Sequence, residues 1–242
     1  MKLQECTRLL SEKALADGYY RKSGIYSSVS RRICRYAGND DISLDEVFTS
    51  GFLNGFRKGL LADEISQNTA VFYLNSVRSI HTAVTDKDRL AANPELMADS
   101  GLTANPGLFA SLSIESVPTE KRAVSDETIA CLHAADLSGN PRLEQCRDTF
   151  MLSFCLQGIP FVDLFHLRKS ELKGDLLTYS RQKTGKPVSV HVLDEAWEYL
   201  SRLLSGHEED THFLLPFLTC SGKDGYKQYQ TALRRYNRQL KM

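Results

Sequence analysis

The sequence predicts a mainly helical protein of two domains, the second of which also carries a small β-hairpin. Apolar residues recur at helical spacing through the first ninety positions, and prolines interrupt this pattern between residues 87 and 120. Beyond the interruption, two β-type runs flank a turn-rich centre at 183–186. The length of 242 residues fits one large or two modest domains.

The first domain is expected to consist of helices. A first amphipathic helix starts at Leu3 and ends before Gly18. A second covers residues 24–37 and stops at the pair Gly38–Asn39, which is a common signal for the end of a helix.

Two further signals shape the rest of this domain. Ser43 and Glu46 have the S-x-x-E spacing of a capping box, in which each side chain accepts a hydrogen bond from the other residue's backbone amide. The strongest helix is expected over residues 67–86, because its apolar positions step by three, three, four and three and so keep to one face. These positions are Val71, Leu74, Val77, His81 and Val84.

Gly51, Gly55 and Gly59 form a ladder at four-residue spacing that encloses two basic residues, Arg57 and Lys58. Outside a membrane, such a ladder indicates either close packing against a neighbouring helix or simply a weak helix. No run of 18 apolar residues occurs, so the sequence predicts no membrane span. The N-terminal run of residues 1–6 meets a charge before any apolar core can form, which argues against a signal peptide, and we expect a cytoplasmic protein.

Prolines then break the helical pattern, because the residue before a proline is pushed out of the α region of backbone conformation. A stretch of this length with weak periodicity is typical of a linker. We therefore place the first domain at 1–105, a linker at 106–119 and the second domain at 120–242.

The second domain is expected to mix helices with the hairpin. Asn140 followed by Pro141 is typical of a helix start, where the missing N–H of proline costs nothing. The runs 175–181 and 187–192 predict the two hairpin strands. Helices are expected over 125–135, from 141 to the stop at 158, over 194–204 and over 226–242.

Metal, cofactor and hydrolase chemistry find no support in the sequence. The six cysteines are scattered without a C-x-x-C pair, which is typical of reduced thiols. None of the six histidines pairs with a cysteine or carboxylate at metal-ligand spacing. The sequence also contains no G-x-S-x-G, no P-loop and no G-x-G-x-x-G, so we expect neither a metal nor a cofactor.

Charge is balanced overall, with 30 basic and 30 acidic side chains, so net charge gives no argument for a nucleic-acid ligand. Its distribution is more informative. Residues 223–242 carry six basic side chains against the single Asp224, and residues 19–37 carry five basic and no acidic ones. Such segments can neutralise phosphates, but they are equally typical of solvated helix faces. The five basic residues are Arg21, Lys22, Arg31, Arg32 and Arg35.

Six motifs between residues 121 and 190 resemble, in order and spacing, those of the tyrosine recombinase (phage integrase) family, in the form common among Bacteroidetes-type integrases. The span from Ile65 to Thr69, followed by Tyr73 and Val77–Arg78, resembles the last helix of that family's SAM-like core-binding domain. The resemblance implies a helical SAM-like core-binding domain followed by an α+β catalytic domain. The six motifs are residues 121–124, 135–138, 146–150, 158–164, 167–170 and 179–185.

The family's chemistry is phosphoryl transfer on DNA without a metal, in which fixed cations stabilise the charge that gathers on phosphate oxygens. By resemblance, Lys183 matches the hairpin lysine that protonates the leaving oxygen. Asp163 matches the acidic position that follows the first catalytic arginine, where its main role is expected to be structural support. Gln157 stands where that arginine is expected. A neutral glutamine brings no charge and no bidentate fork.

The His-x-x-Arg box and the nucleophilic tyrosine of the family have no match before Met242, so the resemblance implies a truncated, catalytically incomplete domain. Such a domain alone is expected to leave apolar helix faces uncovered and to self-associate, whereas residues 1–105 are expected to fold as a monomer. The apolar residues concerned are Leu143, Phe150, Phe154 and Leu233. The residues expected to bind DNA are Arg21, Lys22, Arg31, Arg32, Arg35, Asn68, Thr69, Arg78 and Arg181.

Three functions stay open at this level. The first is an integrase of a mobile element, acting in DNA integration and recombination. The second is a non-enzymatic DNA-binding relic, or a regulator of an active paralogue, and the third is a helical protein-interaction module. The first two predict double-stranded DNA as the partner, with further copies of this chain or an active paralogue on the same DNA.

Overall fold

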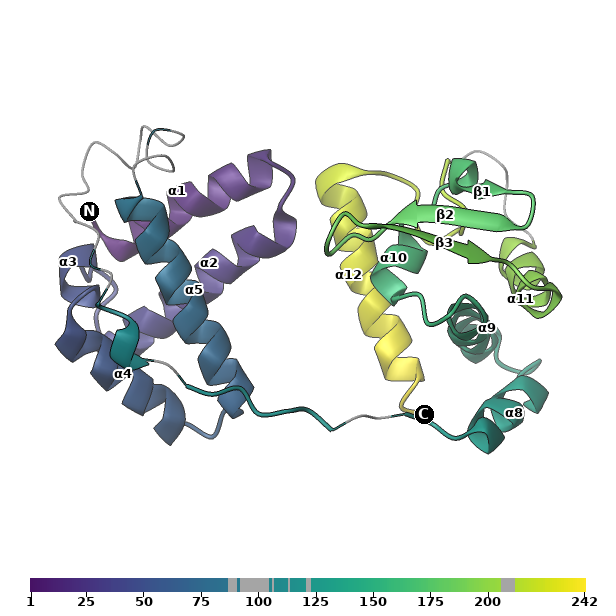
Figure 1. Cartoon of the computed structure of the whole chain (residues 1–242), viewed down its shortest axis with the longest axis horizontal. Helices are drawn as coiled ribbons and strands as arrows, with labels where there is room; N and C mark the ends of the chain where they lie inside the picture. The colour runs from purple at the N-terminus through teal and green to yellow at the C-terminus, as the bar shows by residue number, and fades with distance from the viewer. Residues whose placement is uncertain (87–90, 92–104, 106, 113, 121–122, 206–211) are drawn as a thin grey trace. The chain divides into compact units, whose positions relative to one another are not determined.

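The computed structural model describes residues 1–86, 91, 105, 107–112, 114–120, 123–205 and 212–242. The chain divides into two compact units, 1–121 and 122–242 (Figure 1). We call them unit 1 and unit 2 and describe each by itself. No helix among the described residues is long and apolar enough to cross a membrane.

Unit 1 is helical, with α1 and α2 packed along one another and α5 packed against both α2 and α4 (Figure 1). The glycine of the predicted stop pair ends the second helix in the left-handed conformation, since Gly38 has a φ of 63°. That helix begins at Tyr20, four residues earlier than its apolar pattern indicates. The elements are α1 (Leu3–Ala16), α2 (Tyr20–Ala37), α3 (Leu44–Val47), α4 (Ser50–Ala62), α5 (Gln67–Thr85) and the 3₁₀ turn η1 (Ala110–Leu112).

Side-chain caps start three of these helices. Ser43 accepts a hydrogen bond from the Glu46 amide at 3.2 Å, which is one half of the predicted capping box. Thr49 starts α4, and Ser66 starts α5 by accepting from the Thr69 amide at 3.2 Å. The helix starts are therefore encoded locally.

The core of unit 1 draws on every one of these elements. Unit 1 also reaches beyond residue 105, where the sequence places the end of the first domain, because Leu108, Phe109 and Leu112 are buried in this core. The segment expected to be a linker therefore contributes apolar side chains to the first unit. Other buried members are Leu3, Val29, Ile33, Leu53, Phe56, Leu60, Leu74 and Ile80.

The glycine ladder marks a close helix contact at two of its three positions. The Tyr36 ring of α2 lies across Gly55 and Gly59 of α4, and a Cβ at Gly59 would stand 2.9 Å from Tyr36 Cε2. Gly51 has open space around it. The close-packing interpretation of the ladder is therefore correct for Gly55 and Gly59.

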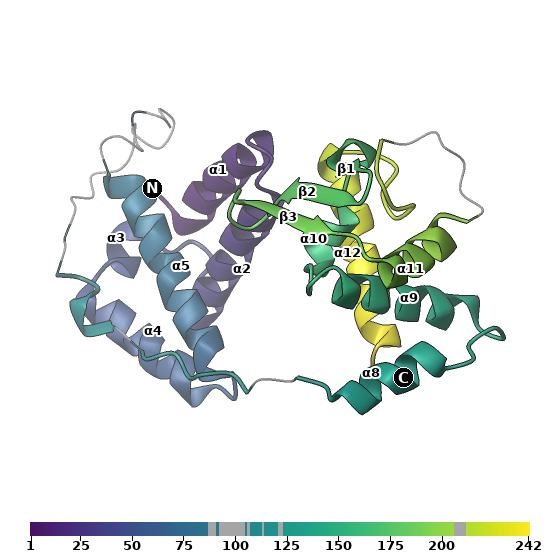
Figure 2. The ribbon, with the colours of Figure 1, turned by 45° about the vertical axis from the view of Figure 1, so that its right-hand side comes forward.

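Unit 2 combines helices with a three-stranded antiparallel sheet in the order β1-β2-β3 (Figures 1 and 2). The predicted hairpin is present, with Leu177 opposite Val190 and Tyr179 opposite Val188. The short first strand was not predicted. The elements are α8 (Asp126–Ala134), α9 (Pro141–Cys155), α10 (Phe161–Phe165), the 3₁₀ turn η2 (Lys169–Glu171), β1 (Leu172–Lys173), β2 (Leu176–Ser180), β3 (Pro187–His191), α11 (Asp194–Leu204) and α12 (Gly222–Gln239).

Two apolar clusters hold unit 2 together. The larger one joins α9 and α11 to the sheet, and Leu152, Leu177 and Tyr199 are buried in it. The smaller one is aromatic and attaches α12 to α10, because the rings of Phe161 and Tyr236 stack with centroids 4.6 Å apart. α12 is thus placed by aromatic contacts on one of its faces.

The apolar side chains expected to be uncovered in this unit differ in exposure. Phe154 is 51% exposed, while Leu143, Phe150 and Leu233 are partly buried. The self-association of this unit stays a prediction.

Candidate nucleic-acid interface

α12 carries basic side chains along one face. Lys223, Lys227, Arg234 and Arg238 are exposed and lie four, seven and four residues apart, which keeps them on the same side of a helix. We call these four residues the α12 stripe. They span sixteen residues, or about 22 Å of helix axis. The stripe faces away from the side that carries Tyr236, so the aromatic contacts leave it free.

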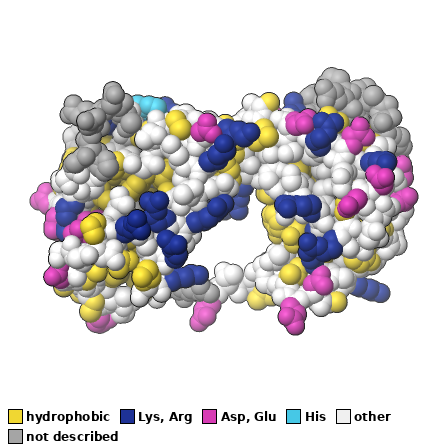
Figure 3. All heavy atoms as spheres, turned by 180° about the vertical axis from the view of Figure 1, so that it is seen from behind, with side chains coloured by type: hydrophobic (Ala, Val, Ile, Leu, Met, Phe, Trp, Pro, Cys, Tyr) yellow, Lys and Arg dark blue, Asp and Glu magenta, His cyan; other side chains and the backbone are white. Residues whose placement is uncertain are grey.

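The α12 stripe is nearly free of acidic partners. Lys227 pairs with Asp224 at 2.9 Å, and none of the other three members has an acidic partner among the described residues. Figure 3 shows lysine and arginine side chains on the surface of each unit. The sequence indicates a basic segment at 223–242, but the residues expected to bind DNA include none from this helix.

α2 carries a second basic face. Arg21, Arg31 and Arg35 are exposed and lie opposite the side of α2 that is buried against unit 1. We call these three residues the α2 face. Over fifteen residues they extend about 21 Å along the helix axis.

The other two basic residues of α2 make contacts within unit 1. Arg32 is largely buried, forms an ion pair with Asp63 and lies over the Tyr73 ring at 5.8 Å. Lys22 lies 5.9 Å from the centre of the Tyr26 ring. Arg32 therefore ties α2 to α4 and α5, and its charge is already compensated.

The three α5 residues expected to bind DNA have intramolecular partners. Asn68 bonds to the backbone of Val117, and the Thr69 hydroxyl lies 2.7 Å from that of Ser66. Arg78 donates to the Phe109 carbonyl oxygen at 3.3 Å and lies over that residue's ring. Each side chain thus has a structural task within unit 1.

In unit 2, the structure brings Asp163 and the hairpin together. Asp163 is buried and accepts a hydrogen bond from the Gln182 amide at 2.8 Å. Its other carboxylate oxygen lies 3.6 Å from Arg181 Nε. Lys183, the next residue after Gln182, is exposed in the turn between β2 and β3. The carboxylate therefore anchors the base of the turn that carries this lysine.

Gln157 occupies an unusual backbone position. It has a φ of 60°, and it is the one residue other than glycine with a positive φ in the part of the chain that the structure describes. Gly158 follows with a φ of 74°, so both residues of this turn are left-handed. A residue with a side chain pays about 1–2 kcal/mol for this conformation. The side chain of Gln157 is exposed, as a ligand contact requires.

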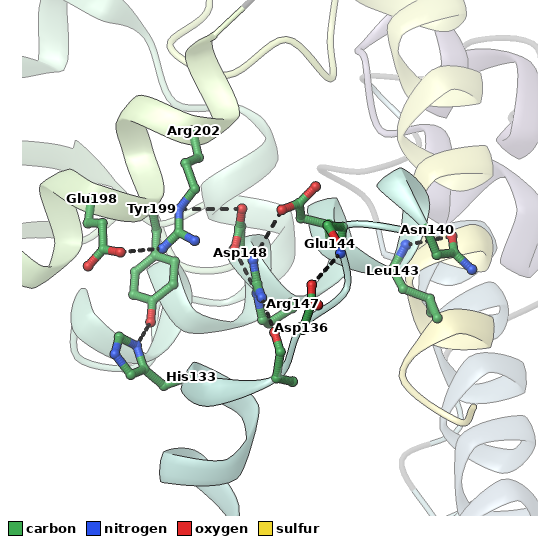
Figure 4. A network of polar contacts seen from close by, with 12 residues as sticks. His133, Asp136, Asn140, Leu143, Glu144, Arg147, Asp148, Glu198, Tyr199 and Arg202 are labelled. Atoms are coloured by element: carbon green, nitrogen blue, oxygen red, sulfur yellow. Dashed lines mark hydrogen bonds and ion pairs between the residues drawn. The ribbon is translucent and has the colours of Figure 1, made fainter.

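A buried charged network, which no sequence pattern indicates, joins α8, α9 and α11 (Figure 4). Asp148 pairs with its neighbour Arg147 at 2.9 Å and with Arg202 of α11 at 3.9 Å. Arg147 also donates to the Ala135 carbonyl oxygen at 2.6 Å, which fixes the end of α8. Both members of the central pair are buried, so we assign this network a structural role.

Two of the buried cysteine thiols are held in the protonated, unreactive form. Burial raises the pKa of the Cys6 thiol to about 12 and that of Cys146 to about 11, which keeps both protonated. Among the residues that the structure describes, no group of histidine, cysteine and acidic side chains could hold a metal ion.

No family model and no curated protein sequence matches this chain. Among solved structures, the chain is similar to a lambda integrase (75–356) dimer bound to a COC' core site, with 16% identity over 98% of this chain and 79% of that one, and a TM-score of 0.60. It is also similar to a lambda integrase tetramer bound to a Holliday junction, with 15% identity over 97% and 65% of the two chains and a TM-score of 0.55. The chain therefore has the fold of lambda integrase.

Proposed function

We propose that this chain is a DNA-binding protein of the tyrosine recombinase (integrase) family and that its ligand is duplex DNA. One observation carries the proposal: a chain with the lambda integrase fold exposes basic side chains in a row on α2 and again on α12. Rows of exposed arginine and lysine neutralise backbone phosphates and release counterions, which supplies most of the affinity of non-specific DNA binding.

The domain roles follow the order of the motifs. Unit 1 is proposed as the SAM-like core-binding domain and unit 2 as the catalytic-type domain of a Bacteroidetes-type integrase carried by a mobile element. The α2 face and the α12 stripe belong to different units. Each unit is therefore proposed to contact phosphates by itself.

Strand exchange is proposed to be weak or absent. Lys183 stands on the hairpin, and Arg181 is held beside Asp163, so two cations are available to a phosphate near this turn. Gln157 supplies only neutral hydrogen bonds at the position expected for the first arginine. Losing one such charged donor slows phosphoryl or acyl transfer by roughly 10²–10³-fold. The favoured function is therefore DNA binding, as a relic or regulator of recombination.

Association on DNA is part of the proposal. The lambda integrase structures hold a dimer on a core site and a tetramer on a Holliday junction. The shared fold supports binding of several copies of this chain, or of an active paralogue with it, along one duplex.

The salt dependence of duplex binding tests the proposal. Fluorescence anisotropy at several salt concentrations gives the slope of log affinity against log salt, which measures the number of phosphates neutralised at about 0.9 each. Replacing Arg234 and Arg238 together with glutamine is expected to lower this slope by about 2. Replacing Arg21 and Arg31 is expected to do the same.

Arg8→Gln is the matched control, because Arg8 is an exposed arginine of α1 that pairs with Glu12 and belongs to neither row. It is expected to leave the slope unchanged. Undetectable duplex binding at low salt would refute the proposal and favour a protein-interaction module. A covalent adduct with a nicked suicide substrate that resists boiling in detergent would contradict catalytic weakness while leaving DNA binding in place.

A further inference from the structure

The segment that leaves the core of unit 1 is fastened to the start of α5 by two side-chain amides. Gln67 Nε2 donates to the Glu115 carbonyl oxygen at 2.7 Å. Asn68 uses both halves of its amide on one residue, since Nδ2 donates to the Val117 carbonyl oxygen and Oδ1 accepts from the Val117 amide, each at 2.9 Å. Asn68 thus pairs with Val117 as a neighbouring strand would.

Hydrogen bonds, and not apolar burial, hold this segment in place. The residues from Glu115 to Val117 are exposed, and the Val117 side chain is 50% exposed. The next apolar anchor on the N-terminal side is Ile114, which packs against the core. On the C-terminal side Pro118 has no N–H to offer, so the pairing ends at Val117.

Capping of α5 does not account for these contacts. Ser66 already caps the helix through the Thr69 amide. The amides of Gln67 and Asn68 instead reach residues 48 and 49 positions away in the sequence. Their partners are main-chain groups, so the contact depends on the backbone of the segment and not on its side chains.

We propose that Gln67 and Asn68 form a clasp that sets the length of the connection between the two units. With the clasp closed, residues 118–124 separate Val117 from Ser125, the N-cap of α8. The eight residue steps from Val117 to Ser125 reach at most about 29 Å whatever their conformation. With the clasp open, the last anchor is Ile114, and the eleven steps from Ile114 to Ser125 reach about 40 Å. Opening the clasp therefore lengthens the maximum reach by about 11 Å.

Two glutamates make the clasp directly testable on the full chain. Glu115 lies inside it, and Glu120 lies three residues beyond its end. A glutamate-specific protease needs an extended, detached backbone, so it is expected to cut the unmodified chain after Glu120 faster than after Glu115. The ratio of the cleavage rates after Glu120 and after Glu115 therefore measures how far the clasp is closed, with both sites in the same molecule.

Asn68→Ala removes two of the three hydrogen bonds and is expected to speed cleavage after Glu115 about tenfold, with no change after Glu120. Asn68→Asp keeps an acceptor for the Val117 amide but loses the donor to the Val117 carbonyl oxygen. Its rate of cleavage after Glu115 is therefore expected to lie between those of the unmodified chain and of Asn68→Ala. Asn75→Ala is the control, because Asn75 is exposed on the same helix and forms no hydrogen bond to the described residues of the segment.

Amide hydrogen exchange provides a second measurement that does not depend on the variants. The Val117 amide is expected to exchange more slowly than that of its neighbour Ser116 in the unmodified chain. The clasp is refuted if both amides exchange alike, or if the protease cuts after Glu115 and Glu120 at equal rates. It is also refuted if Asn68→Ala leaves the Glu115 rate unchanged. None of these measurements involves DNA, so their outcome is independent of the proposed function.

Discussion

Replacing Gly59 with alanine is expected to destabilise unit 1, although alanine is the better helix former. The new Cβ would stand 2.9 and 3.0 Å from two carbon atoms of the Tyr36 ring, so this ring must move. Its edge-to-face contacts with Phe52 and Phe56, both with centroids 5.4 Å apart, would be disturbed. Overpacking costs about 1–3 kcal/mol and helix propensity returns up to about 1 kcal/mol, so we expect a net loss of about 1 kcal/mol.

Gly51→Ala is the matched control, because it changes the same residue type in the same helix at a position with open space. We expect it to stabilise unit 1 by up to about 1 kcal/mol. Thermal melting of the full chain, followed by far-ultraviolet circular dichroism, should separate the two variants by roughly 4–8 °C in the transition of unit 1.

Tyr36→Ala tests the cause. In that background Gly59→Ala no longer meets a ring and should become stabilising, which a double-mutant cycle would record as a coupling energy between the two positions. The fluorescence of Trp197, the one tryptophan of the chain, reports unit 2 and should not change. Equal shifts for Gly51→Ala and Gly59→Ala would refute the packing argument.

Three further expectations concern single side chains. Burial lowers the pKa of His81, so the unfolded chain binds a proton at this residue more readily than the folded chain does. The stability of unit 1 should therefore fall as the pH drops below 6.5, and His81→Phe should remove this pH dependence. Asp148→Ala leaves the buried Arg147 guanidinium with Glu144, 3.6 Å away, as its remaining acidic partner, and should cost about 2 kcal/mol in the Trp197 unfolding transition. A loss under about 1 kcal/mol would contradict the assigned structural role. Gln157→Gly removes the left-handed strain and should raise the stability of unit 2 by about 1 kcal/mol in urea unfolding, whereas Leu156→Gly should lower it.

Features that depend on near neighbours in the sequence could be predicted. The Ser43 cap, the Gly38 stop and the hairpin each rest on residues that meet within a few positions. The two-residue strand β1 is too short to show a period of two, so its pattern gave no signal. The α12 stripe follows from its spacing of four, seven and four residues, because that spacing keeps basic side chains on one face of the expected helix.

Contacts between distant positions could not be predicted in the same way. The resemblance to the recombinase family predicts that Asn68 binds DNA, but its hydrogen-bond partner is Val117, which lies 49 residues away in the sequence. Arg147 and Asp148 are adjacent, and nothing in that pair indicates that Arg202 completes it from α11. In both cases the role of the polar side chain is decided by tertiary packing.

The basic rows on α2 and α12 belong to a chain whose charges cancel, and this has a kinetic consequence. Beyond a Debye length of about 8 Å at physiological salt, an approaching polyanion meets an object of nearly zero charge. Long-range steering should therefore be weak, with an association rate constant near the roughly 10⁵–10⁶ M⁻¹s⁻¹ of neutral partners. Differences in affinity between DNA sites would then be expressed mainly in how long the complex lasts.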